Sequence, residues 1–292
     1  MYHKIYDTFL LLPSDTLLTY FTNYSFGLYT EVHFIKGYLA DTAGLMTLLR
    51  EFLFLDLSPL ANNIIASQLM VVVFKIALEG ICRVYGRFGH SDYTRQLTHM
   101  LMSASVVFWP LFDTQDWSWR LNVLVPAALM SRYFYKGAVL KDPDDIEVRI
   151  VSRTSSPTSL LFGPLQFAVI LVWLGLYRFM TEEAAIIAAA IGIGDGLAPM
   201  IGKVYGRHNY QMPLASPKTM EGSVVGVFLG TIAGCYLYLY MMGIPLLPLR
   251  MVLVYGGIAA VVEGTAPGNL DNLTVPFAIH FSIDKVQEML PA

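Results

Sequence analysis

The chain has 292 residues, of which 55% are hydrophobic and only 14% are charged, and its mean hydropathy is +0.54. Soluble domains carry roughly 25% charged residues, so this composition excludes an ordinary soluble protein and indicates an integral membrane protein. The formal net charge of −3 and the lack of Lys/Arg-rich runs argue against a nucleic-acid partner.

The N-terminal part differs from the rest of the chain. Residues 1–59 mix aromatic side chains with charged residues such as Asp41 and Arg50. An interfacial or short membrane helix fits this mixture better than a clean membrane span. We therefore predict two parts, an N-terminal interfacial segment, 1–59, and a polytopic membrane domain, 60–292.

Apolar runs of about 20 residues, long enough to cross a bilayer, recur along the second part. They predict an all-α fold, a transmembrane helix bundle of about seven to eight spans. The predicted spans lie near residues 60–82, 97–113, 118–138, 160–180, 183–203, 222–243, 245–263 and 271–289.

Basic residues gather in alternate connections between these spans. Three such loops contain Arg83, Arg87 and Arg95; Lys136, Lys141, Arg149 and Arg153; and Lys203, Arg207 and Lys218. The positive-inside rule places these loops, and with them the loop 263–271, on the cytosolic side. Polar clusters far apart in sequence then share one face of the membrane, where a single site becomes possible.

Arg95 and His99 are the first candidate site residues in chain order. Their spacing places them on one face of a helix at the membrane boundary. Ser152 and Arg153 follow, ahead of Gly163-Pro164-Leu165. Packing within the bundle also explains both groups, so the residues alone leave their role open.

The strongest signal is Gly194-Asp195-Gly196-Leu197-Ala198-Pro199, which places a carboxylate inside an otherwise apolar run. An ionisable residue within a membrane is costly unless it is paired or hydrated, so Asp195 is a candidate functional residue. A metal-bound phosphate would supply that pairing. As an alternative, Asp195 caps a broken helix, with Gly194 and Gly196 allowing the break and Pro199 starting the next helix.

The following loop combines cations with hydroxyl groups. It contains Gly202, Lys203, Gly206, Arg207 and His208, then Ser216-Pro217-Lys218-Thr219-Met220-Glu221-Gly222-Ser223. These residue types suit the phosphates of a nucleotide, because phosphoryl transfer depends mainly on positioning and charge neutralisation. The positive flank of a membrane helix explains Lys203 or Arg207 alone about as well. Val204 follows Lys203 where a P-loop has Ser or Thr, which excludes a P-loop kinase.

A second polar cluster lies between the last two apolar runs and offers two carboxylates and two amides. Its carboxylates, Glu263 and Asp271, could complete a metal site with Asp195. Asp271 or Asn272 could instead be only the N-cap of the last helix, with Pro276 in its first turn. Glu263 at a helix end has no such structural explanation.

Glycines recur at every fourth residue in one of the predicted spans. The four are Gly222, Gly226, Gly230 and Gly234. A stripe of small residues lets a neighbouring helix approach closely. We interpret the stripe as a packing surface without a chemical role.

These motifs together resemble the polyprenol kinase family, which includes dolichol, phytol and farnesol kinases. The resemblance is carried by Gly194-Asp195-Gly196, by Lys218-Thr219-Met220-Glu221-Gly222-Ser223 and by Asp271-Asn272-Leu273-Thr274-Val275-Pro276. Ser152-Arg153 and Gly163-Pro164-Leu165 look most like the phytol and farnesol kinase branch. The segment from Arg95 to His99 is similar to an upstream Arg-Lys-x-x-His element of that branch, with Gln96 in place of the lysine.

The resemblance covers about residues 95–280 and implies a kinase. It implies transfer of the terminal phosphate of CTP or ATP to an isoprenoid alcohol such as phytol, farnesol or dolichol, with Mg²⁺ required. It further implies an endoplasmic reticulum or plastid membrane, with the polar site facing the cytosol or stroma. The stretch after Arg153 departs from the family pattern, which leaves the lipid substrate open, and the oligomeric state is not indicated.

Roles for individual residues follow from the same resemblance. Catalytic roles are expected for Asp195, Lys218, Glu221 and Glu263, and magnesium binding for Asp195 and Asp271. The residues expected to contact the nucleotide are Gly194, Gly196, Lys203, Arg207, Thr219, Ser223, Asn272, Arg95, His99 and Arg153.

Two other functions compete with the kinase. A phosphatidate cytidylyltransferase also uses CTP and magnesium in a membrane, but it makes CDP-diacylglycerol. A transporter with broken helices at Asp195 would have pseudo-repeated halves, and the first half of the sequence has no second Gly-Asp-Gly.

Overall fold

The computed structural model describes residues 46, 49–50, 57–89, 91–152, 156–213, 215–268 and 270–290. All of them lie in one compact unit, Gly44–Ala292. The predicted interfacial segment 1–59 falls almost entirely outside the described residues, and so does Arg153. The division of the chain at residue 59 therefore stays a prediction.

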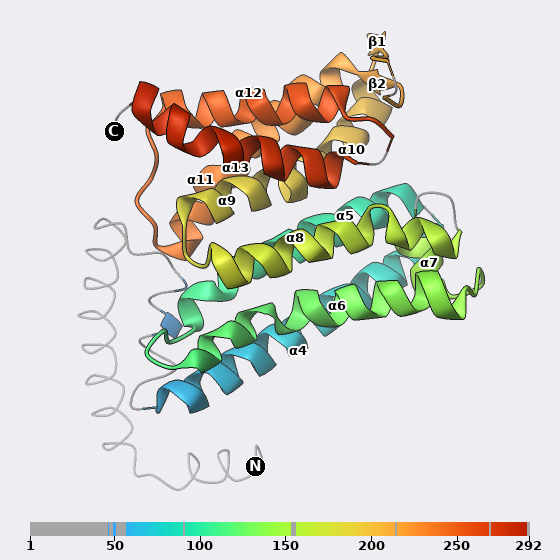
Figure 1. The fold of residues 1–292 in the computed structure, drawn as a ribbon. Helices are drawn as coiled ribbons and strands as arrows, with labels where there is room; N and C mark the ends of the chain where they lie inside the picture. Colours follow the sequence, from blue (N-terminus) through green and yellow to red (C-terminus); the bar gives the residue numbers. More distant parts are fainter. Residues whose placement is uncertain are drawn as a thin grey trace, which may run out of the picture. The chain divides into compact units, whose positions relative to one another are not determined.

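The described residues are almost wholly helical (Figure 1), which confirms the all-α prediction. The α-helices are α4 (Pro59–Phe88), α5 (Ser91–Ser103), α6 (Leu124–Phe134), α7 (Ile146–Val151), α8 (Pro164–Tyr177), α9 (Glu182–Ala188), α10 (Asp195–Tyr205), α11 (Gly230–Met242), α12 (Leu249–Thr265) and α13 (Asp271–Met289). Segments of 3₁₀ helix are Ala104–Leu111, Trp117–Val123 and Pro157–Leu161, and π-helical segments are Tyr135–Leu140, Ala189–Gly194 and Gly222–Leu229. Two short strands, β1 (Asn209–Tyr210) and β2 (Lys218–Thr219), pair antiparallel.

Local sequence signals set the ends of several helices. The Ser58 hydroxyl accepts a hydrogen bond from the backbone N–H of Ala61 at the start of α4, which ends at Gly89 in a left-handed conformation (φ 67°). The Thr181 hydroxyl caps α9 by accepting from the N–H of Ala184. Side-chain caps satisfy backbone donors that a helix end leaves free.

Four helical stretches are long and apolar enough to cross a membrane: Pro59–Arg87, Pro157–Tyr177, Glu182–Tyr205 and Gly222–Met242. They coincide with four of the predicted spans. Of the other predicted spans, 271–289 forms the continuous helix α13 but is not among these four, and two more are shorter or interrupted. The span near 97–113 changes to 3₁₀ helix with an internal proline, and α12 has 17 residues. The number of seven to eight spans stays a prediction.

The glycine stripe brings two helical rods into backbone contact. The π-helical segment before α11 packs against α10. A Cβ atom added at Gly226 would lie 2.4 Å from the Cα of Ala198, and one added at Gly230 would lie 3.3 Å from the Cα of Gly194. The packing role predicted for the stripe is confirmed, and the helix that carries Asp195 is held by it.

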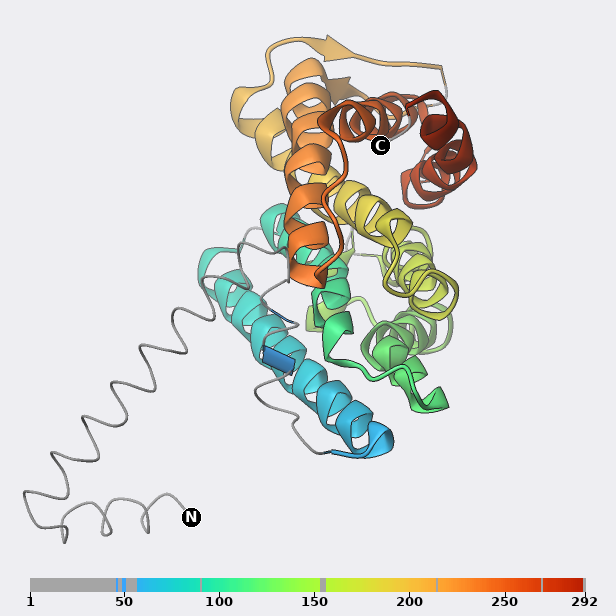
Figure 2. The same ribbon diagram turned by 90° about the vertical axis from the view of Figure 1, so that its left-hand side faces the viewer.

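The helix ends that carry polar residues gather at one end of the bundle. In Figure 1 the start of α5, the end of α10 and the turn between α12 and α13 lie on the same side as the β1–β2 hairpin. In the turned view of Figure 2 the hairpin lies above the C-terminal helices. Sequence-distant polar clusters therefore do share one end, while its cytosolic orientation stays a prediction.

Candidate active site

Asp195 lies inside a continuous helical rod. α9, the π-helical segment Ala189–Gly194 and α10 run on as one stretch, Glu182–Tyr205. Asp195 has helical backbone angles (φ −64°, ψ −35°), and Pro199 lies within α10. The alternative of a broken helix capped by Asp195 is therefore wrong, because the chain accommodates the site by widening a turn and keeps the rod intact.

The two glycines that flank Asp195 face neighbouring helices. A Cβ at Gly194 would lie 2.6 Å from the hydroxyl oxygen of Thr231, and one at Gly196 would lie 2.8 Å from the Cγ of Met100. Neither glycine lines the cavities described below. The expectation that they contact a nucleotide has no support from their position, since close helix packing already requires them.

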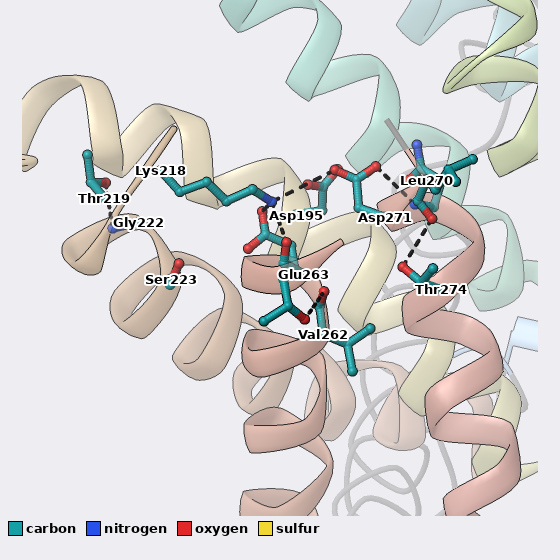
Figure 3. Close-up of polar contacts among 12 residues, drawn as sticks. Asp195, Lys218, Thr219, Gly222, Ser223, Val262, Glu263, Leu270, Asp271 and Thr274 are labelled. Carbon is teal, nitrogen blue, oxygen red and sulfur yellow. Dashed lines mark hydrogen bonds and ion pairs between the residues drawn. The ribbon is translucent and has the colours of Figure 1, made fainter. Parts of the chain in front are cut away.

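Three carboxylates from three helices meet at this end of the bundle (Figure 3). Asp195 begins α10, Glu263 lies near the end of α12, and Asp271 begins α13. One carboxylate oxygen from each lies within 4.8 Å of the other two. The side chains of Glu263 and Asp271 are only 8% and 11% exposed. Like charges this close and this buried are unfavourable unless a cation lies among them.

The ammonium group of Lys218 lies among these carboxylates. Its Nζ donates to the backbone carbonyl of Glu263 at 2.5 Å and to Glu263 Oε1, and it lies 4.0 Å from Asp271 Oδ2. Figure 3 shows the side chain reaching from β2 toward the carboxylates. Three negative charges against one positive charge leave a formal charge of −2 when all four groups are ionised.

Two buried oxygens beside this cluster have no hydrogen-bond partner, Glu263 Oε2 and Asn272 Oδ1. Asn272 is 4% exposed and lines a small internal cavity together with Asp195, Glu263 and Asp271. A buried polar atom without a partner is destabilising. Carboxylate and amide oxygens are the ligands that Mg²⁺ and Ca²⁺ prefer. The residues present therefore fit a divalent cation.

A cavity of about 360 Å³ opens beside the carboxylates. Its polar lining comprises Arg95, Asp195, Lys203, Ser216, Lys218, Thr219, Ser223, Glu263 and Asp271. This volume lies within the range of small-molecule sites, about 300–1,000 Å³. Cations on one part of the wall and carboxylates on another suit a polyphosphate that carries a divalent cation.

The hairpin that presents Lys218 is anchored by its own polar contacts. The backbone N–H of Gly222 donates to the Thr219 hydroxyl at 3.1 Å, and the hydroxyls of Tyr210 and Ser223 are 2.6 Å apart. A Cβ at Gly264 would lie 2.7 Å from the Tyr210 hydroxyl oxygen, so the hairpin fits closely on α12. These contacts hold the base of the Lys218 side chain at the cavity wall.

A second, smaller cavity of about 70 Å³ shares Asp195 with the first. Arg95 and His99 both line it, as their spacing predicts, and His99 Nδ1 lies 3.8 Å from Asp195 Oδ2. Apolar side chains, among them Phe162, close part of its wall. Asp195 therefore stands between a polar cavity and a partly apolar one.

Gln96 is a lining residue that the sequence interpretation missed. It is 3% exposed, lines the smaller cavity, and its Oε1 has no hydrogen-bond partner. The signal was available in the sequence, because Gln96 lies three residues before His99 and so on the same face of α5 as that histidine.

Other predicted site residues lie away from the carboxylates. Glu221 binds His208, with its Oε1 2.7 Å from Nδ1 and its Oε2 accepting from the backbone N–H, and it lines none of the cavities around Asp195. Arg207 is exposed and is also absent from these linings. Lys203 lines the larger cavity but forms an ion pair with Asp92.

The start of α13 also differs from the capping alternative. Leu270 is the N-cap residue and makes no side-chain cap, while Asp271 is the first helical residue. Asp271 Oδ1 accepts from the backbone N–H of Asn272 at 3.0 Å. Pro276 lies inside the helix. Interpreting Asp271 or Asn272 as a simple N-cap is therefore wrong, and both side chains line the smaller cavities.

Sequence comparison finds similarity to proteins named phytol kinases. A probable chloroplastic phytol kinase 1 of Glycine max is 28% identical over 195 residues, which cover 63% of this chain and 64% of the relative. The chain resembles the phytol kinases. A chloroplastic phytol kinase 1 of Arabidopsis thaliana is 25% identical over 63% of each chain, and a phytol kinase of Synechocystis is 35% identical over 99 residues, 31% of this chain and 40% of that one.

The similarity to phytol kinases covers part of each protein. The alignments span just under two thirds of the length of the plant relatives that match first. No protein-family model matches the chain. The predicted resemblance to the polyprenol kinase family, including its phytol kinase branch, is confirmed at this level.

Proposed function

We propose that this protein is a metal-dependent kinase that phosphorylates an isoprenoid alcohol, with phytol as the first candidate, at the polar end of its helix bundle. The observation that carries the proposal is the meeting of Asp195, Glu263 and Asp271 around Lys218, next to a cavity lined by further cations. The similarity to proteins named phytol kinases supports the same reaction class.

The larger cavity is the proposed site of the nucleoside triphosphate, CTP or ATP. Arg95, Lys203 and Lys218 supply positive charge on its wall. Phosphoryl transfer needs such groups because negative charge spreads over the transferred phosphate oxygens in the transition state. Asp195, Glu263 and Asp271, with the amide oxygen of Asn272, would hold a Mg²⁺ ion, which would neutralise phosphate charge when bound.

The smaller cavity is the proposed entry point of the lipid hydroxyl. Its wall combines Phe162 with Gln96 and His99, so an apolar chain and a hydroxyl both find suitable contacts. Asp195 borders both cavities and would lie between acceptor and donor. His99, beside Asp195, would accept a hydrogen bond from the hydroxyl and orient its oxygen.

We further propose a plastid membrane as the location, because the plant relatives are named as chloroplastic. The alternative is the endoplasmic reticulum. Fractionation of cells that express the full chain, with markers for both membranes, distinguishes the two. Enrichment with the endoplasmic reticulum marker would contradict the plastid assignment.

The direct test is an assay of phosphate transfer by the detergent-solubilised protein. CTP or ATP labelled at the γ-phosphate is supplied with Mg²⁺ and a panel of phytol, farnesol, dolichol and diacylglycerol. We expect a labelled lipid monophosphate together with the nucleoside diphosphate, with phytol preferred, and loss of this product with Asp195→Asn. A CDP-lipid with pyrophosphate would indicate a cytidylyltransferase, and no transfer to any alcohol would overturn the kinase.

A further inference from the structure

We infer that Lys218 is an exchangeable internal counter-ion: it occupies the cation position among the carboxylates until a divalent cation displaces it, and it then binds the phosphates of the nucleotide. The inference rests on the proposed function in that it takes the larger cavity to be the nucleotide site. It assigns Lys218 two successive partners, whereas a simple phosphate-binding lysine has one.

The contacts of Lys218 are those a metal ion would need. Its Nζ donates a hydrogen bond to Glu263 Oε1 and lies 4.0 Å from Asp271 Oδ2. Both carboxylates belong to the three that could hold a metal ion. A divalent cation and an ammonium group at the same oxygens repel each other and compete for the same lone pairs. Binding of the metal therefore requires the ammonium group to move away.

The ammonium group of Lys218 offsets one of the three carboxylate charges. The formal charge of the three carboxylates is −2 with the ammonium group among them and −1 with a divalent cation in its place, so the metal ion neutralises the cluster further than the lysine does. Glu263 Oε2 and Asn272 Oδ1 keep no partner while Lys218 is in place. The lysine thus lowers the electrostatic cost of burying the carboxylates, but it leaves these two oxygens without a hydrogen-bond partner.

The side chain can move while the hairpin stays fixed. The backbone around Lys218 is held by the pairing of Tyr210 with Lys218, by the N–H of Met220 donating to the carbonyl of His208 at 2.9 Å, and by the Thr219–Gly222 contact. The ammonium itself stands on a flexible four-carbon stem. Lys218 also lines the larger cavity, so a rotation of that stem would bring it to a bound phosphate.

Thermodynamic linkage follows from this exchange. A metal ion that binds alone must displace Lys218 from its carboxylate contacts without supplying an anion in exchange. A nucleotide supplies that anion, so each ligand strengthens the binding of the other by the same factor. The inference therefore predicts weak metal binding without nucleotide and strong mutual enhancement with it.

The first experiment measures Mn²⁺ binding to the solubilised full chain by electron paramagnetic resonance, without lipid. In the absence of nucleotide, Lys218→Gln should bind Mn²⁺ about tenfold more tightly than the wild type, because a competing cation close to the carboxylates is gone. Non-hydrolysable CTP or ATP analogues should enhance binding to the wild type and much less to Lys218→Gln. Lys203→Gln is the matched control, since Lys203 lines the same cavity but pairs with Asp92; without nucleotide its Mn²⁺ affinity should equal that of the wild type.

The second experiment uses the wild type, so it does not depend on the folding of a variant. Lysine acetylation is followed by mass spectrometry at Lys218 and Lys203. Lys218 starts at 13% side-chain exposure and should react slowly. Mg²⁺ alone should accelerate its modification, and Mg²⁺ with the nucleotide analogue should slow it again, while Lys203 should not respond to Mg²⁺ alone.

The outcomes separate this inference from the kinase proposal. Equal or weaker Mn²⁺ binding by folded Lys218→Gln, or Lys218 labelling that Mg²⁺ leaves unchanged, would overturn the exchange even if the protein phosphorylates an alcohol. No Mn²⁺ binding by any variant would overturn it as well. The expected Mn²⁺ and labelling results without phosphate transfer would support the exchange and count against the kinase alone.

Discussion

Two clusters of charged side chains in the described part of the chain differ in their balance. In one, Arg132 and Lys136 from the end of α6 and the segment after it face Asp145 and Glu147 at α7. Lys136 Nζ lies 2.7 Å from Asp145 and 2.6 Å from Glu147, and Arg132 Nε lies 2.5 Å from Glu147. Two cations meet two carboxylates.

The cluster around Asp195 has three carboxylates and one lysine. Glu147 Oε1 also lacks a partner, but its carboxylate is held by two cations, whereas Glu263 is paired with Lys218. A balanced buried cluster fixes one segment of chain against another. An unbalanced one that borders a cavity needs a further cation, and this difference separates the candidate site from a structural contact.

The largest expected effect comes from a matched pair of aspartates that each stand at the start of a helix. Asp271→Asn should lower phosphate transfer by about 10²- to 10³-fold, because it removes one charge from a metal-binding group. Asp145→Asn should leave transfer by the folded protein unchanged, since Asp145 pairs with Lys136 and caps α7. Initial rates at saturating Mg²⁺ measure both. A similar loss in both variants would contradict the distinction between the clusters.

The next effect concerns two buried asparagines that each have an oxygen without a partner, Asn272 and Asn122. Asn272→Ala should weaken Mn²⁺ binding by about 10- to 100-fold, the usual cost of removing a supporting group from a metal site. Asn122→Ala should leave Mn²⁺ binding unchanged, because its amide donates to the carbonyl of Gly175 away from the site. Equal Mn²⁺ affinity in the two variants would remove Asn272 from the proposed ligand set.

A smaller effect is expected in the balanced cluster, and it falls on stability. Lys136→Met leaves Asp145 without its cation and Glu147 with one instead of two. The free energy of unfolding should fall by about 3 kcal/mol, since removing one partner strands a buried charge. Thermal unfolding in detergent measures this change. A lower melting temperature together with a loss of Mn²⁺ affinity would show that the two clusters are coupled.

The smallest effect is expected at Glu221. Hydrogen bonds from its own backbone N–H and from His208 lower its pKa to about 2, from an ordinary value of 4.5. A carboxyl with a depressed pKa stabilises the fold above its unfolded pKa and loses this effect as pH falls through the folded value. Digestion by pepsin around the hairpin should therefore increase as pH falls from 4.5 toward 2. Glu221→Gln, the control for pepsin's own pH dependence, should show no such additional increase.

The sequence predicted the membership of the Asp195 cluster better than its packing. Asp195, Glu263 and Asp271 could be selected because carboxylates in or beside apolar runs have few structural explanations. Gly194 and Gly196 were predicted to contact the nucleotide. In the structure they instead allow the close approach of α11 and α5. Those contacts depend on which helices become neighbours, and periodicity within one helix does not specify that.

The pairing of Lys218 with Glu263 illustrates the same limit. The two residues are 45 positions apart, and their contact depends on the hairpin lying across the end of α12. The motif around Lys218 also predicted a catalytic role for Glu221. In the structure the Glu221 carboxylate contacts His208 and not the Asp195 cluster. The helical class was predictable from hydropathy, whereas 3₁₀ and π-helical interruptions obscure the number of spans because they arise from local packing.

The π-helical segment Ala189–Gly194 sets the rotational phase of everything that follows it in the rod. Each residue of an α-helix advances the direction of the side chains by about 100°, and a π turn takes up additional residues before the α-helix resumes. Shortening this segment by one residue would swing Asp195 by about 100° away from Glu263 and Asp271. The wide turn thus acts as an angular spacer: the length of an apolar segment sets the direction in which Asp195 points.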